Sequence, residues 1–132
     1  MTRPHRVDEI PFLANLGIEV ENASDGRRRI SAPVTPRVIN PCGVLHGGIT
    51  FTLADTGMGI AAYTLLASGE RTTTVESSIR YLRPAKSGRI IAECHVIRRS
   101  NRFAITEAKV FDEAGEVVAV AGGSFYISRS KT

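Results

Sequence analysis

Hydrophobic and polar residues are mixed along most of the chain, but one long stretch is almost uncharged. From Ile49 to Leu66 the run is rich in Ala, Leu and Met, and Asp55 is the only charged residue between His46 and Glu70. An apolar run of this length predicts a buried helix rather than a strand. Its small residues would let the backbone of a sheet or a partner approach closely.

Four later stretches, separated by turn residues, read as long strands, and the first of them alternates between hydrophobic and polar residues. They cover residues 72–82, 89–99, 102–112 and 117–128. In the first of them, strict alternation puts Val75, Ile79 and Tyr81 on one face and Thr74 on the other. The pair Gly122-Gly123 predicts a bulge or a tight bend in the last strand.

Before the long helix, the pattern predicts a short helix, a hairpin and an irregular connection. Residues 10–16 read as the helix, residues 18–22 and 27–32 as hairpin strands around the Asp25-Gly26 turn, and the proline-containing residues 33–41 as the connection. This order of elements predicts an α+β domain, in which a curved antiparallel sheet wraps one long central helix. We expect the last four strands to form a meander.

Length and composition predict a single domain over residues 1–132, with residues 1–9 and 129–132 loose. No stretch of 20 residues is free of charge and apolar enough for a membrane span. The first residues carry charges and prolines but no apolar signal segment, so we expect a cytoplasmic protein.

Cysteine and histidine usage argues against a disulfide framework or a metal site. Cys42 and Cys94 are expected to be buried or half-buried thiols, and His5, His46 and His95 lie far apart without metal-ligand spacing. The net charge of +4 could suit nucleic acid, an anionic membrane or a phosphorylated small molecule. Nucleic acid fits poorly, because aromatic residues do not interleave with basic ones.

The segment from Asn40 to Asp55 has the residues that could perform chemistry. Gly47 and Gly48 stand at the start of the predicted helix, where the first amides lack internal partners and face the positive end of the helix dipole. Both N–H groups could therefore bind an oxyanion or a carbonyl oxygen. Asp55 places a carboxylate in apolar surroundings, which is costly unless the group has a use.

The same segment resembles a known family. The pattern Asn40-x-x-Gly43-x-x-His46-Gly47-Gly48, followed by an Asp nine residues after the His, is similar to that of hotdog-fold acyl-CoA thioesterases of the phenylacetate-pathway (PaaI-like) type. The resemblance continues through residues 74–88 and covers roughly residues 10–128. It implies the hotdog fold and hydrolysis of an acyl-CoA thioester without a metal or redox cofactor.

The resemblance also implies roles for individual residues. Asp55 would act as general base or nucleophile, and the Gly47 amide would polarise the thioester carbonyl. Asn40 and His46 would shape the site and help to hold that carbonyl, although both could instead only order the loop. Thr74 matches the position whose hydroxyl orients the attacking water, yet strand alternation places it on the wrong face.

The family is built as homodimers with composite sites, often as homotetramers that are dimers of dimers. The length of the predicted helix supports the same expectation. Eight positions separate Gly47 from Asp55, which places them about 12 Å apart along the helix axis. No single carbonyl group can reach both. Two antiparallel helices about a two-fold axis would bring Gly47 of one chain to Asp55 of the other.

Basic residues in the second half of the chain could bind the phosphates of coenzyme A. The candidates are Arg80, Arg83, Lys86, Arg98 and Arg102. Ordinary solvated charge remains the alternative for each of them, and the 82–88 and 99–102 turns would lie at opposite ends of one strand.

Two other functions remain open. A hotdog enoyl-CoA hydratase would need an acidic residue where Val38 stands, which counts against it. A non-catalytic acyl-CoA binding module would not need Asp55. The acyl group stays undetermined, with Phe51, Met58 and Tyr63 as candidates for shaping its pocket.

Overall fold

In the computed structural model of the chain, residues 7–21 and 24–129 are described. The helices are the 3-10 helix η1 (Val7–Glu9), α1 (Pro11–Asn15), the 3-10 helix η2 (Pro36–Val38) and α2 (Gly47–Tyr63). The strands are β1 (Glu19–Glu21), β2 (Arg27–Pro33), β3 (Glu70–Tyr81), β4 (Arg89–Arg99), β5 (Phe103–Phe111) and β6 (Val117–Arg129). Of the ends predicted to be loose, residues 1–6 and 130–132 lie outside the described residues.

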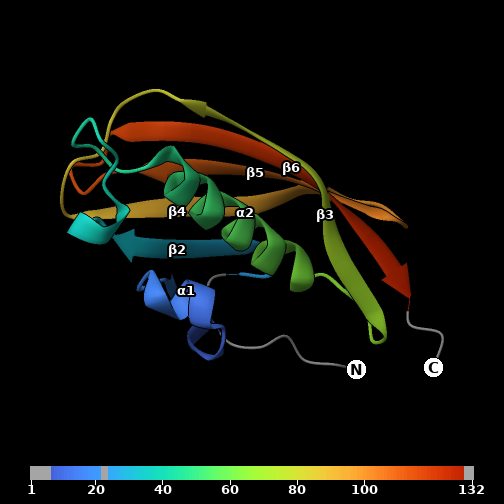
Figure 1. Cartoon of the computed structure of the whole chain (residues 1–132). Helices are drawn as coiled ribbons and strands as arrows, with labels where there is room; N and C mark the ends of the chain where they lie inside the picture. The colour runs from blue at the N-terminus through green and yellow to red at the C-terminus, as the bar shows by residue number, and fades with distance from the viewer. Residues whose placement is uncertain (1–6, 22–23, 130–132) are drawn as a thin grey trace.

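The strands form one six-stranded antiparallel sheet in the order β1-β2-β4-β5-β6-β3. This sheet curves around α2, which lies across its inner face (Figure 1). The predicted α+β class and the hotdog arrangement are therefore confirmed. Within the described residues, no helix is long and apolar enough to cross a membrane.

The predicted meander is wrong for β3. This strand does not pair with β4, its successor in the chain, but with β6 at the far edge of the sheet. The vacant side of β4 pairs with β2 of the first hairpin, with Ile30 opposite Ala92. Residues 82–88 therefore cross from β3, at one edge of the sheet, to β4 in its interior. Alternation along each strand predicts its faces but contains no information about its neighbours, which are chosen by long-range packing.

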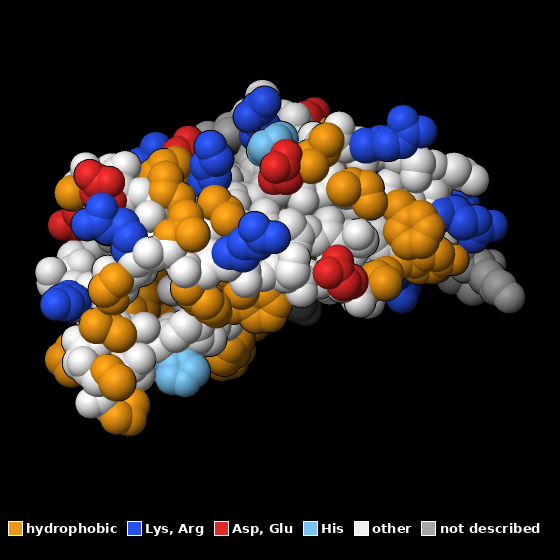
Figure 2. All heavy atoms as spheres, turned by 90° about the horizontal axis from the view of Figure 1, so that it is seen from above, with side chains coloured by type: hydrophobic (Ala, Val, Ile, Leu, Met, Phe, Trp, Pro, Cys, Tyr) orange, Lys and Arg blue, Asp and Glu red, His pale blue; other side chains and the backbone are white. Residues whose placement is uncertain are grey.

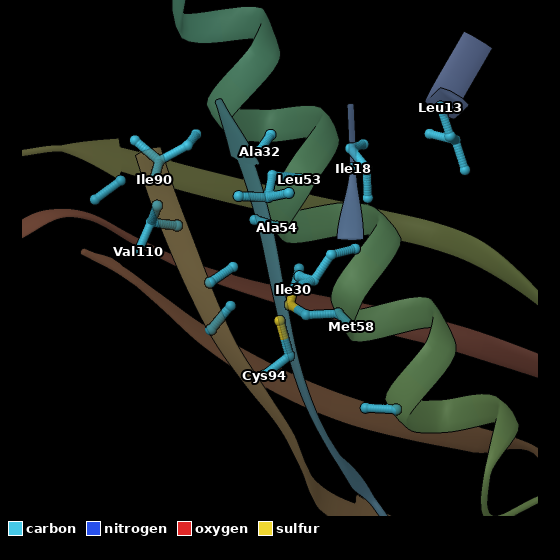
Figure 3. Close-up of a cluster of buried hydrophobic side chains, with 14 of the residues drawn as sticks. Leu13, Ile18, Ile30, Ala32, Leu53, Ala54, Met58, Ile90, Cys94 and Val110 are labelled. Atoms are coloured by element: carbon cyan, nitrogen blue, oxygen red, sulfur yellow. The ribbon is translucent and has the colours of Figure 1, made fainter. Parts of the chain in front are cut away.

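The core lies between α2 and the inner face of the sheet (Figure 3). Its fully buried large side chains include Leu53 and Met58 from the helix, with Ile30, Ile90 and Val110 from the strands. Buried positions on α2 recur at helical spacing, which directs one stripe of the helix into the sheet. Complete burial of each such side chain stabilises the fold by about 1.5–3 kcal/mol.

Gly57 sets how closely α2 can approach the sheet. A Cβ atom at this position would lie 2.5 Å from the Cys94 Sγ and 2.7 Å from the Ile30 Cγ2. The helix therefore rests directly on β2 and β4 where no side chain separates them. Cys94 is buried here, and burial, together with the nearby Glu93 charge, raises the pKa of its thiol to about 12. Cys42, by contrast, is exposed, so that half of the cysteine prediction is wrong.

The predicted bulge at Gly122-Gly123 is also not found in β6. Both glycines pair regularly with their neighbours on β3 and β5. The register shift in the β3–β6 pairing lies between Thr74 and Glu76, and that in the β5–β6 pairing lies between Val110 and Phe111. Gly123 instead makes room, because a Cβ atom there would lie 3.0 Å from the Ser77 Oγ and 3.3 Å from the Met58 Cε.

An ion pair connects the start of β3 to the end of β4. Glu70 is 5% exposed and accepts a hydrogen bond from the Ala67 amide at 2.7 Å. Arg99 forms a hydrogen-bonded ion pair with the same carboxylate oxygen. The Ala67 hydrogen bond first, and the Arg99 guanidinium second, hold the pKa of Glu70 below its ordinary value of 4.5 despite the opposing effect of burial. The pair therefore ties the turn after α2 to the end of β4.

We predict that Gly57→Ala destabilises the protein. Overpacking a filled core costs about 1–3 kcal/mol, partly offset by about 1 kcal/mol because Ala favours helix over Gly. Gly59→Ala is the matched control, since its Cβ would meet only the Phe125 ring edge at 3.3 Å. Urea unfolding at one protein concentration should show the loss for Gly57→Ala alone. Equal stability of the two variants would contradict the close packing at Gly57.

We also predict that the contribution of Glu70 to stability depends on pH. Its folded pKa is lowered, so the contribution is complete above its ordinary value of 4.5 and is lost as the pH falls through the folded value. At pH 7, Glu70→Gln should lower the free energy of unfolding by about 2 kcal/mol. The difference from wild type should shrink towards pH 3. Glu116→Gln, which affects only an exposed pair with Arg83, should cost less than about 1 kcal/mol.

Candidate functional site

The loop before α2 is held by the side chain of Asn40. The side-chain Oδ1 accepts hydrogen bonds from the amides of Cys42 at 2.9 Å and Val44 at 3.2 Å. The backbone N–H of Asn40 donates to the Val44 carbonyl. The next residues are anchored to the rest of the fold, because Leu45 N–H donates to the Ala85 carbonyl. Asn40 therefore orders the loop that leads into the helix, which is one of the two roles expected for it.

His46 caps the helix. The ring Nδ1 of His46 accepts a hydrogen bond from the Gly48 amide at 2.8 Å. The backbone N–H of His46 donates to the Val38 carbonyl. A neutral imidazole that accepts at Nδ1 carries its proton on Nε2. The exposed ring can thus donate one hydrogen bond from Nε2 to a ligand while it keeps the helix capped.

The two glycine amides differ, contrary to the expectation that both would be available. The Gly48 N–H is taken by His46, whereas the Gly47 N–H has no acceptor among the described residues. A free amide at the first position of a 17-residue helix lies at the positive end of the helix dipole. Gly47 is therefore the glycine that can bind a carbonyl oxygen or an oxyanion.

Asp55 is half-buried, and its carboxylate is not alone. Its Oδ1 accepts hydrogen bonds from the Thr74 hydroxyl at 3.1 Å and the Ser77 hydroxyl at 3.2 Å. Both partners belong to β3, so the strand orients the carboxylate of the helix. No donor among the described residues reaches Oδ2, which leaves that oxygen available to a water molecule or a substrate.

A bulge in β3 explains why strict alternation put Thr74 on the wrong face. Thr74 pairs with Phe125, but Glu76 pairs with Ser124, so Val75 is an extra residue on β3. The extra residue reverses the alternation, and Thr74 comes to share the inner face with Ser77, Ile79 and Tyr81. The pattern alone could not reveal this bulge. Strict alternation already put Ser77 on the face of Ile79 and Tyr81, but it gave no sign that Ser77 contacts Asp55.

The opposite end of β3 reaches the start of the helix. Tyr81 donates a hydrogen bond from its hydroxyl to the Gly47 carbonyl at 2.7 Å. Beside this contact lies a hollow of about 360 Å³, whose lining includes Asn40, Leu45, Gly47, Tyr81, Leu82 and Pro84. The Gly47 amide thus lies next to an open, largely apolar space. Tyr81 was expected on the same face as Ile79, but its contact with Gly47 was not.

Within one chain the two reactive groups stay apart. Gly47 lies near the end of β3 and Asp55 near its middle, and eight helical residues separate them by about 12 Å. The described residues contain no group of three or more His, Cys, Asp or Glu side chains that could hold a metal ion. The arrangement offers a carboxylate and a separate amide donor, which suits hydrolysis of an acyl compound.

The basic residues expected to bind coenzyme A do not gather in one place. Arg83 forms an ion pair with Glu116 at 3.2 Å, and Lys86 is exposed in the same 82–88 connection. Arg102, at the other end of the sheet, donates to the Tyr126 hydroxyl at 3.2 Å. Arg98 lies near that end, where it pairs with Ile105 of β5, whereas Arg80 lies in β3 and pairs with Val120 of β6. One chain therefore does not assemble them around a single phosphate.

Comparison with known proteins shows the family of this chain. A family model described as the thioesterase superfamily matches residues 42–119. A Halobacterium salinarum protein, named provisionally as an esterase, is 35% identical over 134 residues that cover 93% of this chain and 88% of the relative. The 1,4-dihydroxy-2-naphthoyl-CoA hydrolase of Escherichia coli is 28% identical over 77% of this chain and 75% of the relative.

Among solved structures, a Bacillus halodurans protein crystallised with CoA shares 34% identity and a TM-score of 0.79. The match covers 90% of this chain and 75% of that one. The family match includes the Gly47–Asp55 segment, β3 and the connection that carries Arg83 and Lys86. The chain belongs to the thioesterase superfamily, a family of thioester hydrolases with the hotdog fold.

Proposed function

We propose that this protein is an acyl-CoA thioesterase of the PaaI-like type. The observation that carries the proposal is the pairing of a carboxylate held by two hydroxyls with a helix N-terminal amide that has no acceptor among the described residues. Relatives support the substrate class, because one is named as a CoA thioester hydrolase and another was crystallised with CoA. The apolar hollow beside Gly47 provides space for part of such a substrate.

In the proposed reaction, Asp55 activates water or attacks the thioester carbon itself. In the first case, the carboxylate takes a proton from water, and the oxygen of that water forms the new bond to the carbon. In the second, the Asp55 oxygen forms that bond, and water then hydrolyses the resulting anhydride. In both, the Gly47 N–H stabilises the oxyanion before the carbon–sulfur bond breaks and coenzyme A leaves as its thiolate, which then takes up a proton.

The remaining residues serve these two groups. Thr74 and Ser77 orient Asp55 through their hydroxyls, and Thr74 could also contact the attacking water. His46 holds Gly48 and can donate from Nε2 to the thioester. Basic residues in the 82–88 connection and the 98–102 turn remain candidates for the phosphates of coenzyme A. Arg99 is not among them, because it is engaged with Glu70.

We further propose a homodimer with two composite sites, each formed by Gly47 of one chain and Asp55 of the other. Two features of the single chain support a partner. Strand β3 ends the sheet with a 12-residue edge, and long open edges invite pairing with another strand. Val75, at the bulge of that strand, is 60% exposed. Within one helix, Gly47 and Asp55 are about 12 Å apart. The dimer would instead bring Gly47 of one chain to Asp55 of the other.

A dimer of dimers remains our proposal for the larger assembly. The outer face of the sheet carries exposed hydrophobic side chains near the β4–β5 turn, namely Ile97, Phe103 and Ile105. Figure 2 shows hydrophobic side chains at several places on the molecule, including one group at the right of the view beside basic side chains. Exposed apolar patches of this kind often mark protein interfaces, which supports further association of dimers.

We predict that Asp55→Asn keeps the fold and lowers turnover at least about 100-fold, because the amide preserves shape but is neither base nor nucleophile. Thiol release should be measured with a panel of acyl-CoA substrates, and acyl-CoA binding measured in parallel. Asp25→Asn, in an exposed turn, is the matched control and should leave turnover unchanged. Near wild-type turnover of Asp55→Asn would remove Asp55 from the mechanism, and binding without hydrolysis by the wild type would indicate a binding module.

We also predict that two inactive variants complement each other. Asp55→Ala and Gly47→Val should each be inactive alone. After they are unfolded and refolded together, about a quarter of wild-type activity should return, because half of the dimers are mixed and each mixed dimer has one intact site. Each variant refolded alone is the control. Demonstrable heterodimers without recovered turnover, or an active monomer, would refute the shared site.

A further inference from the structure

The peptide that links Gly47 to Gly48 is held at both ends. Its carbonyl oxygen, on Gly47, accepts a hydrogen bond from the Tyr81 hydroxyl at 2.7 Å. Its N–H, on Gly48, donates to the His46 Nδ1 at 2.8 Å. Two consecutive glycines would otherwise give the backbone wide freedom at this point. The two hydrogen bonds restrict the plane of this peptide and thereby the conformation of Gly47.

The ring of Tyr81 also lies directly over Gly47. A Cβ atom at this residue would be 3.1 Å from both the Tyr81 Cζ and the Tyr81 Oη. Gly47 is absent from the residues of positive φ, so an unusual backbone conformation does not explain why glycine stands here. Glycine suits this position because a side chain here would press against the tyrosine ring and force it to shift.

The sheet delivers Tyr81 to this position. The residue ends β3 opposite Ala119, on the inner face that the bulge at Val75 assigns to Thr74 and Ser77 as well. The following amide, of Leu82, donates to the Val118 carbonyl, which anchors the strand end. The ordinary pKa of a tyrosine is 10.0, and the partial burial of Tyr81 raises it further, so the hydroxyl remains a donor at neutral pH.

We propose that Tyr81 is a positioning residue for the Gly47 amide. The inference rests on the proposed function, in which that amide stabilises the oxyanion. The peptide before Gly47 is already anchored, because the His46 carbonyl accepts from the Ile49 amide at 3.0 Å. Tyr81 anchors the peptide after it. The Gly47 N–H belongs to the first of these two peptides, and with the next peptide also held its direction is set before substrate arrives. A donor that needs no reorganisation is worth more to the transition state.

The substitution Tyr81→Phe tests the inference, since it keeps the ring over Gly47 and removes only the hydroxyl. We expect kcat to fall about tenfold while KM changes less than about twofold, because a misdirected oxyanion donor affects the transition state more than substrate binding. The midpoint of urea unfolding should stay unchanged. Wild-type kcat, or an increase in KM that accounts for the whole loss, would overturn the proposal.

A second readout reports on the backbone itself. In protein labelled with [15N]glycine, Tyr81→Phe should shift the amide resonances of Gly47 and Gly48. The resonance of Gly115, in the turn before β6, should stay in place and serves as the control. Unchanged Gly47 and Gly48 resonances would show that the hydroxyl does not hold this peptide.

Assays of the wild type and of Asp55→Asn alongside Tyr81→Phe distinguish a failure of the positioning role from a failure of the proposed function. If Asp55→Asn abolishes turnover while Tyr81→Phe behaves as wild type, only the positioning role fails. If Asp55→Asn retains turnover, Asp55 is removed from the mechanism, and Tyr81→Phe still tests the positioning role. If the wild type hydrolyses no acyl-CoA, the proposed function fails, and the resonance shifts alone then decide whether Tyr81 holds Gly47.

Discussion

The close packing of α2 against the inner face of the sheet is the constraint on which the rest of this structure depends. At Gly57 the helix backbone lies so near Cys94 and Ile30 that a methyl group would not fit. This contact sets the depth of the helix in the sheet. Because the helix is one rigid element, its depth also determines which part of β3 meets Gly47 and which part meets Asp55.

Strand β3 is the second element of the site, although most of its side chains are exposed. Its inner face meets the helix twice, at Tyr81 beside Gly47 and at Thr74 and Ser77 beside Asp55. Only the bulge at Val75 allows these residues to share one face. The bulge thus has a clear structural consequence, since a regular strand would turn either Thr74 or the other contacts away from the helix.

Charge is distributed unevenly along this scaffold. Arg99 forms an ion pair with Glu70 that connects β4 to β3, and Arg83 forms an ion pair with Glu116. The basic excess of the chain is therefore partly structural, and only some of it remains for an anionic ligand. The remaining candidates lie at opposite ends of the sheet, so the phosphates of one coenzyme A molecule could reach both groups only if chains combine.

The amino-acid sequence by itself determined the long helix, the long strands, the hotdog class and the segment from Asn40 to Asp55. These features follow from periodicity, turn residues and motif spacing, which act over short distances along the chain. Only the tertiary structure decided that β3 pairs with β6, that Val75 is an extra residue and that Ser77 and Tyr81 contact α2. It also decided that His46 occupies the Gly48 amide and leaves that of Gly47 without an acceptor among the described residues. Strand partners and register depend on side chains far apart in the sequence, and a shift of one residue exchanges the two faces of a strand.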